Sequence, residues 1–370
     1  MEQIDYENLY ELNKPFMDDY KSAFANTLDS GWFILGNQVK TFEKDFADYL
    51  KAGSFLGVAS GLDALELPLV AMEWEEAYEV LVPSNTYIAT INAIINTGHT
   101  PVFVDADPLT YNIDVTKIEE KITSKTRAIM IVHLYGNPCE MDAIMAICKK
   151  HQLLLIEDCA QSHGAAYKNQ MTGTFGEFGA FSFYPTKNLG ALGDAGGIAI
   201  NNEEYSDKLK ALRNYGSHIK YHNDYIGYNS RLDEVQAAFL SVKLKALDAI
   251  NAHKQKLANL YLTHLKSDYI LPQTTAHSEA VYHIFAVRHE KRDALKAYLL
   301  EKGIKTEIHY PIVPCEQNSI KNYMAKINYQ LDPADFTIAT QIHRTELSLP
   351  CSTIHSEEQI LRVIEVLNAF

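Results

Sequence analysis

Short apolar runs alternate with stretches of helical periodicity from about residue 20 to residue 240. The runs are continuous and bounded by turn residues, which is typical of strands buried on both faces. Strands of this kind separated by helices predict an α/β domain with a mostly parallel sheet. The predicted strands cover residues 80–83, 101–105, 128–133, 153–157 and 196–200, and the predicted helices cover residues 90–96, 141–149 and 203–213.

A smaller second part is predicted beyond the longest helical stretch, residues 230–266, in which no residue interrupts the pattern. We expect this helix to connect a large domain, residues 1–245, to a small α+β domain, residues 246–370. The last helix of the small domain should begin at Ser356, which forms a capping-box pattern with Gln359. The other elements predicted there are strands at 281–288 and 305–309 and a helix at 293–301.

Composition and charge narrow the class of function. The 370 residues are 47% apolar and 22% charged, as in ordinary globular proteins. The net charge of −14 disfavours a general role in binding nucleic acids or anionic membranes. No run is long and apolar enough to span a bilayer, and the acidic start does not resemble a signal peptide. The five cysteines form no CxxC pair, so we expect no metal site, no disulfides and a cytoplasmic setting.

Asp158 and Lys187 are the residues most indicative of chemistry. Asp158 closes the apolar run at 153–157, and Lys187 precedes a glycine-rich run at 190–197. Enzymes that use pyridoxal phosphate need such a pair, because a lysine binds the cofactor aldehyde and a carboxylate keeps the pyridinium nitrogen protonated. Each residue also has an ordinary explanation, as a strand-end cap or a solvated lysine. The glycines match neither a dinucleotide fingerprint nor a P-loop, so tight turning is their simplest role.

Five further residues are candidates for contacts with such a cofactor. Ser60 lies where a strand turns into a helix, so it suits a phosphate, although capping is the commoner role. Ser182 is a second phosphate candidate or else a buried hydroxyl. Tyr87 lies between a strand and a helix and could stack on a planar ring or belong to the core. Gln161 and His163 follow the strand-end aspartate, where one of them could bond a phenolic oxygen.

Taken together, nine segments resemble one family along nearly the whole chain. It is the DegT/DnrJ/EryC1/StrS family of sugar aminotransferases, which are fold-type I enzymes dependent on pyridoxal phosphate. The resemblance implies a large domain with a seven-stranded sheet, similar to aspartate aminotransferase, and a smaller C-terminal α+β domain. The segments are SGWFILG (30–36), VASGLDAL (58–65), VPSNTYIAT (82–90), VHLYGNPCEMD (132–142), EDCAQSHGA (157–165), SFYPTKNLGALGDAGGI (182–198), LRNYG (212–216), GYNSRLDEVQAA (227–238) and IHYP (308–311).

The resemblance implies a role for each matching residue. Lys187 binds the cofactor covalently and shuttles protons, Asp158 pairs with the ring nitrogen, and Gln161 bonds the phenolic oxygen. Tyr87 stacks on the ring. Asn229 reaches the phosphate of the neighbouring subunit's cofactor, which implies a homodimer with shared active sites. The residues that surround the phosphate are Ser60, Gly61, Leu62 and Ser182.

One departure from the family concerns Leu62, because the family usually has threonine there. The hydroxyl is lost while the backbone amide remains, so we expect the phosphate to be held somewhat more weakly or in a rearranged way.

The substrate prediction rests on the same resemblance. A lysine at position 187 favours transamination over the dehydration carried out by a related branch with histidine there. The segment 216–224, with VHLYG at 132–136, is similar to enzymes that aminate C3 of dTDP-3-keto-6-deoxyhexoses, and L-glutamate is the implied donor. Contacts to this nucleotide-linked sugar are expected from Tyr184, Lys220, Tyr221, His309 and Tyr310.

Several alternatives remain open at this stage. His309 and Tyr310 could be ordinary packing residues, and Lys220 could be a solvated surface lysine. The acceptor could instead be a 4-keto-sugar or a keto-cyclitol, and a lyase or dehydratase is disfavoured by Lys187. A non-catalytic regulator or scaffold on the same fold should have lost Lys187, Asp158 or Gln161. The expected product is a deoxyamino sugar for a polysaccharide, such as a lipopolysaccharide O-antigen, or for a glycoside.

Overall fold

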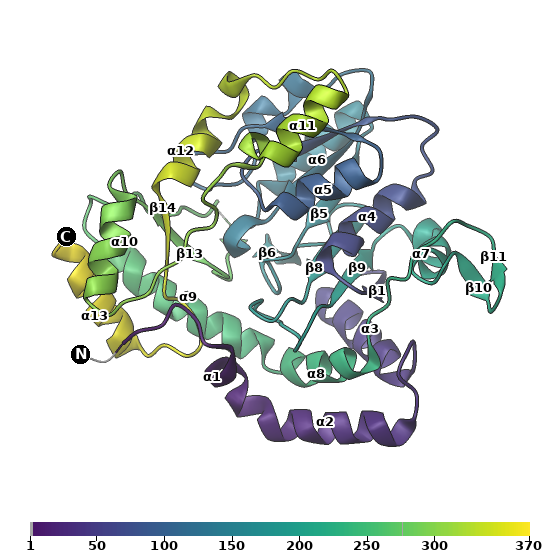
Figure 1. Cartoon of the computed structure of the whole chain (residues 1–370), viewed down its shortest axis with the longest axis horizontal. Coiled ribbons are helices and arrows are strands. Elements are labelled where there is room, and N and C mark those ends of the chain that lie inside the picture. The colour runs from purple at the N-terminus through teal and green to yellow at the C-terminus, as the bar shows by residue number, and fades with distance from the viewer. Residues whose placement is uncertain (1–2, 276) are drawn as a thin grey trace.

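A computed structural model describes residues 3–275 and 277–370 of the chain (Figure 1). Its centre is a seven-stranded sheet in the order β1-β9-β8-β5-β4-β2-β3. β9 runs antiparallel to both of its neighbours, and all other neighbouring pairs in this sheet are parallel. The predicted α/β class with a mostly parallel sheet is therefore confirmed. The strands are β1 (Ser54–Val58), β2 (Glu79–Pro83), β3 (Thr100–Val104), β4 (Thr126–Val132), β5 (Leu154–Asp158), β8 (Phe178–Ser182) and β9 (Gly196–Ile200).

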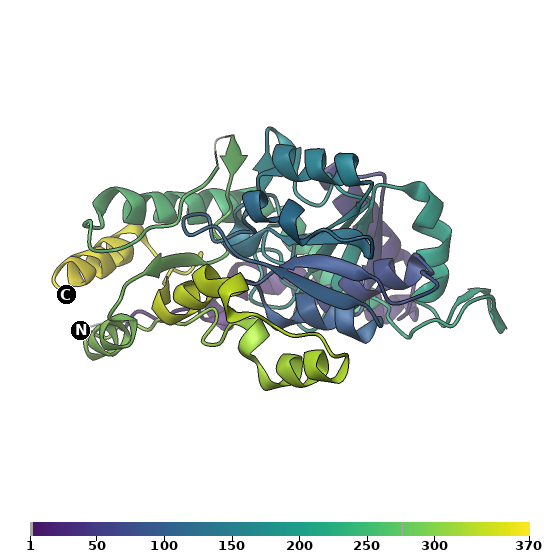
Figure 2. The same cartoon turned by 90° about the horizontal axis from the view of Figure 1, so that it is seen from above.

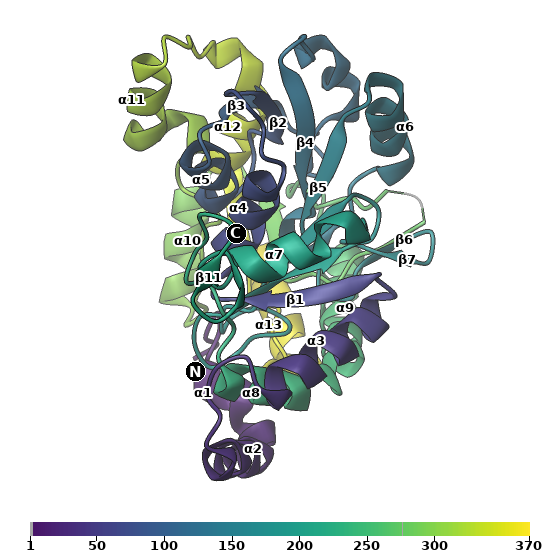
Figure 3. The same ribbon diagram turned by 90° about the vertical axis from the view of Figure 1, so that its right-hand side faces the viewer.

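Helices cover both faces of this sheet, as its apolar strands require. Figure 3 shows β1 between α4 and α7 on one side and α3 and α8 on the other. The helices share buried cores with the strands on each face, which leaves the carboxyl ends of the parallel strands free to form a site. One face carries α4 (Gly61–Ala71), α5 (Ile88–Asn96) and α7 (Ser206–Leu212), and the other carries α3 (Asn37–Leu50), α6 (Met141–His151) and α8 (Glu234–Leu244).

The long helix predicted at 230–266 is in fact two helices, so the prediction of an unbroken helix was wrong. α8 ends at Leu244, and α9 (Leu247–His264) begins after Ala246, whose φ of −105° and ψ of 0° deviate from ideal helical values although the residue stays in the right-handed helical region. The break changes the side against which the chain packs. Leu240 is buried in the core of the large sheet, whereas Leu257 is buried in a separate C-terminal core.

The C-terminal core is built around a two-stranded antiparallel sheet. β13 (Phe285–Arg288) pairs with β14 (Glu346–Leu349), and the helices α9, α10 (Arg292–Glu301) and α13 (Glu357–Asn368) pack on it. The predicted capping box at Ser356 and Gln359 is confirmed by hydrogen bonds in both directions.

The strand predicted at 305–309 was wrong, and the one predicted at 281–288 is shorter than expected. Only Glu307 pairs with β14, as an isolated bridge to Ser348, so segment 305–309 forms no continuous ladder.

One C-terminal segment returns to the large sheet. It contains α11 (Asn318–Lys326) and α12 (Thr337–Thr345), and its residues Ile320, Met324 and Ala339 are buried in the same core as α4 and α5. Figure 1 shows α11 and α12 close to α5. The division at residues 245 and 246 stays a prediction, and this segment ties the two predicted domains together.

The remaining elements are the helix α2 and a set of short helices, strands and 3₁₀ turns. α2 lies along α8, and the β10–β11 hairpin projects away from the body of the molecule (Figures 1 and 2). The elements not described above are α1 (Leu9–Asn13), α2 (Met17–Ser30), β6 (Ala166–Tyr167), β7 (Gln170–Met171), β10 (Ser217–Ile219), β11 (His222–Asn223), β12 (Ser278–Glu279) and the 3₁₀ turns η1 (Lys14–Phe16), η2 (Val115–Lys117), η3 (Glu119–Lys121), η4 (Leu134–Gly136), η5 (Glu203–Tyr205), η6 (Pro314–Glu316) and η7 (Pro333–Phe336). Among the described residues, no helix has both the length and the apolar character needed to cross a membrane.

Glu234 of α8 provides a stability test, because it caps α3 from a distance of 198 positions along the chain. The residue that precedes α3 is Gly36, which has no side chain with which to cap. The buried Glu234 carboxylate instead accepts hydrogen bonds from the backbone N–H groups of Gly36 at 2.7 Å, Gln38 at 2.9 Å and Val39 at 3.0 Å.

We therefore predict that Glu234→Ala lowers the free energy of unfolding by about 3 kcal/mol, because three backbone donors, two of them buried, lose a charged acceptor. Urea denaturation followed by circular dichroism measures this loss. Glu365→Ala, at an exposed position of α13, is the control and should change stability by less than about 0.5 kcal/mol. Equal stability losses in the two variants would contradict the capping role.

Candidate active site

A cavity of about 620 Å³ opens at the carboxyl ends of the central strands. Its walls come from the ends of β5 and β8, the first turns of α4 and α5, and the C-terminal segment at residues 309–310. Every predicted site residue except Lys220, Tyr221 and Asn229 lines it. The residues that the structure brings together are Ser60, Gly61, Leu62, Tyr87, Asp158, Gln161, Ser182, Tyr184, Lys187, His309 and Tyr310.

Asp158 is the last residue of β5 and is only 5% exposed. Its Oδ2 accepts a hydrogen bond from Thr90 Oγ1 at 2.8 Å, and its Oδ1 accepts one from the backbone N–H of Ala160 at 3.1 Å. Burial raises the pKa of Asp158, and these two hydrogen bonds and the charge of Lys187 oppose the rise. A cationic ring nitrogen at this carboxylate would stabilise the ionised form further.

Lys187 follows β8 on a short loop that is folded back on itself, since its backbone N–H donates to the carbonyl of Tyr184 at 2.8 Å. Burial lowers the pKa of Lys187 from 10.5 to about 8, and the opposite charges of Asp158 and Glu7 limit the drop. A lysine with this pKa is neutral far more often at physiological pH than an exposed one. Its amine is therefore suited to attack an aldehyde and to accept a proton.

The turn from β1 into α4 lines the cavity and forms the cradle in which the sequence predicts a phosphate. Ser60 caps α4, because its Oγ accepts a hydrogen bond from the backbone N–H of Asp63 at 3.1 Å. The capping role considered for Ser60 is therefore confirmed. Gly61 brings α4 close to β8, since a Cβ at this position would lie 2.6 Å from the Cβ of Ser182. The amides of the first helical turn and the positive end of the helix dipole then face the cavity, where a dianion is stabilised.

Tyr87 and Gln161 lie on the walls of the cavity. Tyr87 keeps 53% of its surface exposed, so the alternative of a core residue was wrong. The centroid of its ring lies 5.2 Å from the ring centroid of Tyr310. The side chain of Gln161 accepts a hydrogen bond from the backbone N–H of Tyr135 at 2.6 Å, and its Nε2 donates to the hydroxyl of Tyr310 at 3.3 Å. The amide orientation is thereby fixed with its donor end towards the cavity.

His163 does not line the cavity. It is fully buried against Phe181 and Phe183, and burial lowers its pKa to about 3. Of the two loop residues considered for the phenolic oxygen, only Gln161 is in a position to reach the site.

The residues present fit pyridoxal phosphate. The cavity offers a buried carboxylate for the ring nitrogen, a poorly solvated lysine, an aromatic wall and a helix N-terminus that only a glycine allows close to β8. When bound, the cofactor supplies an electron sink for the carbon that loses or gains a proton. The chain's own contribution would be to hold the ring and to keep water away from it, and Lys187 Nζ would be placed to move protons.

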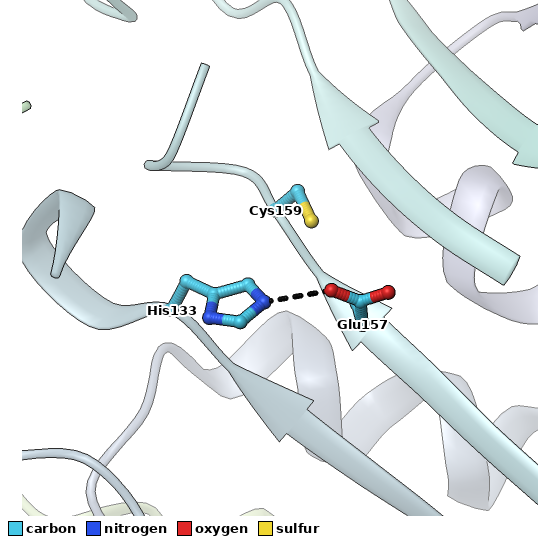
Figure 4. Close-up of side chains that lie close together, drawn as sticks. All are labelled: His133, Glu157 and Cys159. Atoms are coloured by element: carbon cyan, nitrogen blue, oxygen red, sulfur yellow. Dashed lines mark hydrogen bonds and ion pairs between the residues drawn. The ribbon is translucent and has the colours of Figure 1, made fainter. Parts of the chain in front are cut away.

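Glu157, which precedes Asp158, anchors the site from the opposite face of β5. Figure 4 shows it with His133 and Cys159, three buried residues whose ligand atoms lie within 4.8 Å of one another. The Glu157 carboxylate accepts hydrogen bonds from His133 Nε2 at 3.0 Å and from three backbone N–H groups of residues 173–176. His133 Nδ1 accepts from the backbone N–H of Cys139. Both side chains are therefore occupied by hydrogen bonds that fix the end of β5.

Thr90 was missed by the sequence analysis. It lies in the first turn of α5, and its hydroxyl is also within 2.8 Å of the Thr86 hydroxyl. The signal that could have identified it is a pair of threonines spaced by four residues in an otherwise apolar helix start, because buried hydroxyls need partners. Asp194 and His283, which also line the cavity, were missed as well.

Lys220, Tyr221 and Asn229 do not reach the cavity of their own chain. Lys220 and Tyr221 form the exposed tip of the β10–β11 hairpin, where the ammonium lies 5.0 Å from the tyrosine ring centroid. Tyr221 is 85% exposed. Asn229 is exposed and forms an isolated bridge with Asn214.

The pKa of about 8 for Lys187 predicts how covalent capture of the cofactor depends on pH. Only the neutral amine attacks an aldehyde, so capture of pyridoxal phosphate by cofactor-free protein should accelerate as pH rises and level off above about 8. Stopped-flow absorbance measures the rate, and Lys187→Ala should show no covalent phase. A rate that keeps rising towards the pKa of 10.5 typical of an exposed lysine would show that Lys187 is solvated.

Comparison with known proteins agrees with this geometry. A model of the DegT/DnrJ/EryC1/StrS aminotransferase family matches residues 17–368. The chain is 48% identical over 99% of both chains to the dTDP-3-amino-3,6-dideoxy-α-D-galactopyranose transaminase of Aneurinibacillus thermoaerophilus. It is 41% identical to the dTDP-3-amino-3,4,6-trideoxy-α-D-glucose transaminase of Streptomyces venezuelae, over 94% of this chain and 90% of the relative.

Solved structures give the same result. The crystal structure of DesV from S. venezuelae matches with a TM-score of 0.95 and 38% identity, over 100% of this chain and 98% of the other. The structure of ntda from Bacillus subtilis, solved with bound cofactor pmp, matches with a TM-score of 0.89 and 30% identity, over 99% and 85% of the two chains. The chain therefore belongs to the DegT/DnrJ/EryC1/StrS aminotransferase family, and its cofactor is pyridoxal phosphate.

Proposed function

We propose that this aminotransferase moves an amino group from L-glutamate to C3 of a dTDP-linked 3-keto-6-deoxyhexose. The observation that carries the proposal is the similarity, over nearly the full length, to relatives whose names specify dTDP-3-amino sugars. The chemistry of the cavity supports it. Tyr184, His309 and Tyr310 offer hydroxyl and imidazole groups beside Lys187, and such groups suit the hydroxyls of a sugar.

In this proposal each active-site residue has a specific role in transamination. Asp158 holds the protonated ring nitrogen, Gln161 and Tyr87 orient the ring, and the start of α4 with Ser60, Gly61 and Leu62 binds the phosphate. Lys187 Nζ removes and returns the proton at the reacting carbon, which its lowered pKa favours. A scaffold on the same fold would not need these groups together, yet Lys187, Asp158 and Gln161 all line one cavity.

We further propose a homodimer in which each site contains residues of both subunits. Lys220, Tyr221 and Asn229 are exposed and remote from the cavity of their own chain. Large exposed apolar side chains also lie at α2 and at the β10–β11 hairpin, which is typical of surfaces that bind another protein. On and just after α2 they are Phe24, Leu28, Trp32, Phe33 and Ile34, and at the β10–β11 hairpin they are Ile219, Tyr221 and Ile226.

We also propose a cytoplasmic setting and a division of the chain into two domains. All five cysteines are free and buried, as in proteins of a reducing compartment such as the cytoplasm. Residues 1–245 and 246–370 would act as the large and small domains, since the C-terminal core centres on β13 and β14.

The position of amination can be tested directly. Incubation with L-glutamate and either 3-keto or 4-keto dTDP-6-deoxyhexoses, followed by NMR of the product, should give the 3-amino sugar. A buried polar group that loses its partner costs about 1–3 kcal/mol, so a misplaced ketone should react at least about fivefold more slowly. Formation of the 4-amino sugar alone would overturn the position while leaving the aminotransferase activity in place.

A subunit-exchange experiment tests the shared site. Lys187→Ala and Asn229→Asp proteins, each inactive or strongly impaired alone, are mixed under conditions in which exchange is proven by mass spectrometry. If Asn229 acts on the partner's phosphate, a heterodimer contains one site with both native residues, and up to about a quarter of the activity should return. If exchange occurs and no activity returns, Asn229 acts within its own chain or not at all.

A further inference from the structure

β14 carries two fully buried polar residues, Glu346 and Ser348, on one face. Successive side chains of a strand alternate between its faces, so Leu347 and Leu349 point the other way, into the C-terminal core. The polar face is turned towards residues 307–309, with which β14 forms its isolated bridge. A buried carboxylate and a buried hydroxyl in a strand of only four residues need partners, and the structure supplies a specific one.

That partner is His309, on the wall of the active-site cavity. Glu346 Oε2 accepts a hydrogen bond from the backbone N–H of His309 at 2.8 Å. Glu346 Oε1 is hydrogen-bonded to Ser348 Oγ, and Ser348 Oγ lies 2.8 Å from His309 Nδ1. His309 Nε2 has no hydrogen-bond partner within residues 3–275 and 277–370. A continuous chain of hydrogen bonds thus runs from a buried carboxyl group to an imidazole whose other nitrogen is unoccupied.

We propose that Glu346 and Ser348 are positioning residues of a proton relay that ends at His309 Nε2, and that the protonation of Glu346 decides whether Nε2 donates to or accepts from a substrate oxygen. The relay deepens the proposed function, on which the identity of that oxygen as a sugar oxygen rests.

The geometry allows two states of the relay. The backbone N–H of His309 is always a donor, so Oε2 must accept and only Oε1 can carry a proton. When Glu346 is ionised, the Ser348 hydroxyl donates to Oε1 and accepts from Nδ1–H, which leaves Nε2 as an acceptor. When Glu346 is protonated, Oε1–H donates to Ser348 and the hydroxyl donates to Nδ1. The ring proton is then on Nε2, where it can be donated.

Transfer through the relay balances without an imidazolium ion. The Nε2–H bond breaks as an O–H bond forms on the substrate, Ser348 gives its proton to Nδ1, and Glu346 gives its proton to Ser348. The net result moves one proton from Glu346 to the substrate oxygen and leaves Glu346 as a carboxylate. The reverse sequence removes a proton from the substrate. Addition to a ketone and loss of water both require such transfers at oxygen.

The electrostatics of the two ends suit this exchange. Burial lowers the pKa of His309 to about 4, so the ring is neutral, and burial raises the pKa of Glu346 to about 8 against the opposing hydrogen bonds of Ser348 and His309. The protonated state of the relay therefore dominates below about pH 8 and the ionised state above it. The charged and titratable groups that act on these two residues are Arg292, Lys296, Lys187, His283, Tyr6, Tyr111, Tyr135 and Tyr310.

The state of His309 can be read without any activity. In cofactor-free protein labelled with ¹⁵N-histidine, long-range ¹H–¹⁵N NMR distinguishes the two tautomers, and His309→Asn identifies the signals. We expect His309 to change from the Nε2–H to the Nδ1–H form as pH rises through about 8. One unchanged tautomer across this range in the native protein would overturn the relay.

Three variants separate the relay from simple packing. In Glu346→Gln the amide oxygen must face the backbone N–H of His309, so its NH₂ group faces Ser348 and locks the Nε2–H form at every pH. Ser348→Ala should remove the dependence of the tautomer on pH. Glu307→Gln, at a neighbouring exposed carboxylate, is the control and should keep it. If the tautomer still changes with pH in folded Glu346→Gln or Ser348→Ala, the proposal is wrong.

A kinetic measurement on the cofactor-loaded enzyme tests the consequence for the reaction. Because general acid–base groups contribute at least about 100-fold, Glu346→Gln should lower kcat for sugar amination by about 100-fold, with a smaller change in KM. An unchanged kcat would show that the relay takes no part in the reaction. Absence of amination in the native protein would count against the proposed function instead, and the tautomer measurement would still decide the relay.

Discussion

The burial of two opposite charges at the end of one sheet is the constraint on which the rest of the structure depends. Asp158 is buried and Lys187 is half-buried, and the charge of each is poorly stable alone, since burial raises the pKa of the acid and lowers that of the lysine. Each partly offsets the cost of the other. The chain must therefore hold both at fixed positions, and the edge of a mostly parallel sheet does this because successive strands end there side by side.

Side chains alternate between the two faces of β5, and this places a structural carboxylate on one face and the active-site carboxylate on the other. Glu157 and Asp158 are adjacent, so their side chains point to opposite faces of the sheet. Glu157 is saturated by His133 and by the backbone of residues 173–176 and anchors the strand, as Figure 4 shows for His133. Asp158 keeps only two hydrogen bonds and retains capacity for a cationic partner. Two neighbouring carboxylates thus differ in role because they differ in the number of donors around them.

Much of the fold and the site could be predicted because they follow local rules. Five strands of the large sheet were predicted from apolar runs, whereas β1 was recognised only by its end and β8 was not predicted. Asp158 was recognised at the end of one such run, and Lys187 from its position before the glycine-rich run. The break between α8 and α9 could not be predicted, since Lys245 and Ala246 are good helix formers and neither ends a helix by its own propensity. Thr90 was missed for a similar reason, because its importance lies in a contact 68 positions away.

The C-terminal segment brings the groups that the sheet cannot provide. The sheet edge supplies the lysine, the carboxylate and the phosphate cradle, whereas His309 and Tyr310 approach from the side of β14, and Glu7 from the N-terminal segment lies beside Lys187 in an adjoining small cavity. Burial raises the pKa of Glu7, and Lys254, Lys243 and Lys187 oppose the rise.

Both ends of the chain thus contribute buried titratable groups to a site whose frame lies in the middle of the chain. The segment containing α11 and α12 packs on the same core as α4 and α5, so it holds the C-terminal groups against the frame. This packing of the C-terminal groups against the frame is consistent with the proposed proton relay from Glu346 through Ser348 to His309. Glu346, the acid of the proposed relay, lies on the short strand β14 and not on the strands that end at the cavity. It can therefore be buried deeply without disturbing the Asp158 carboxylate.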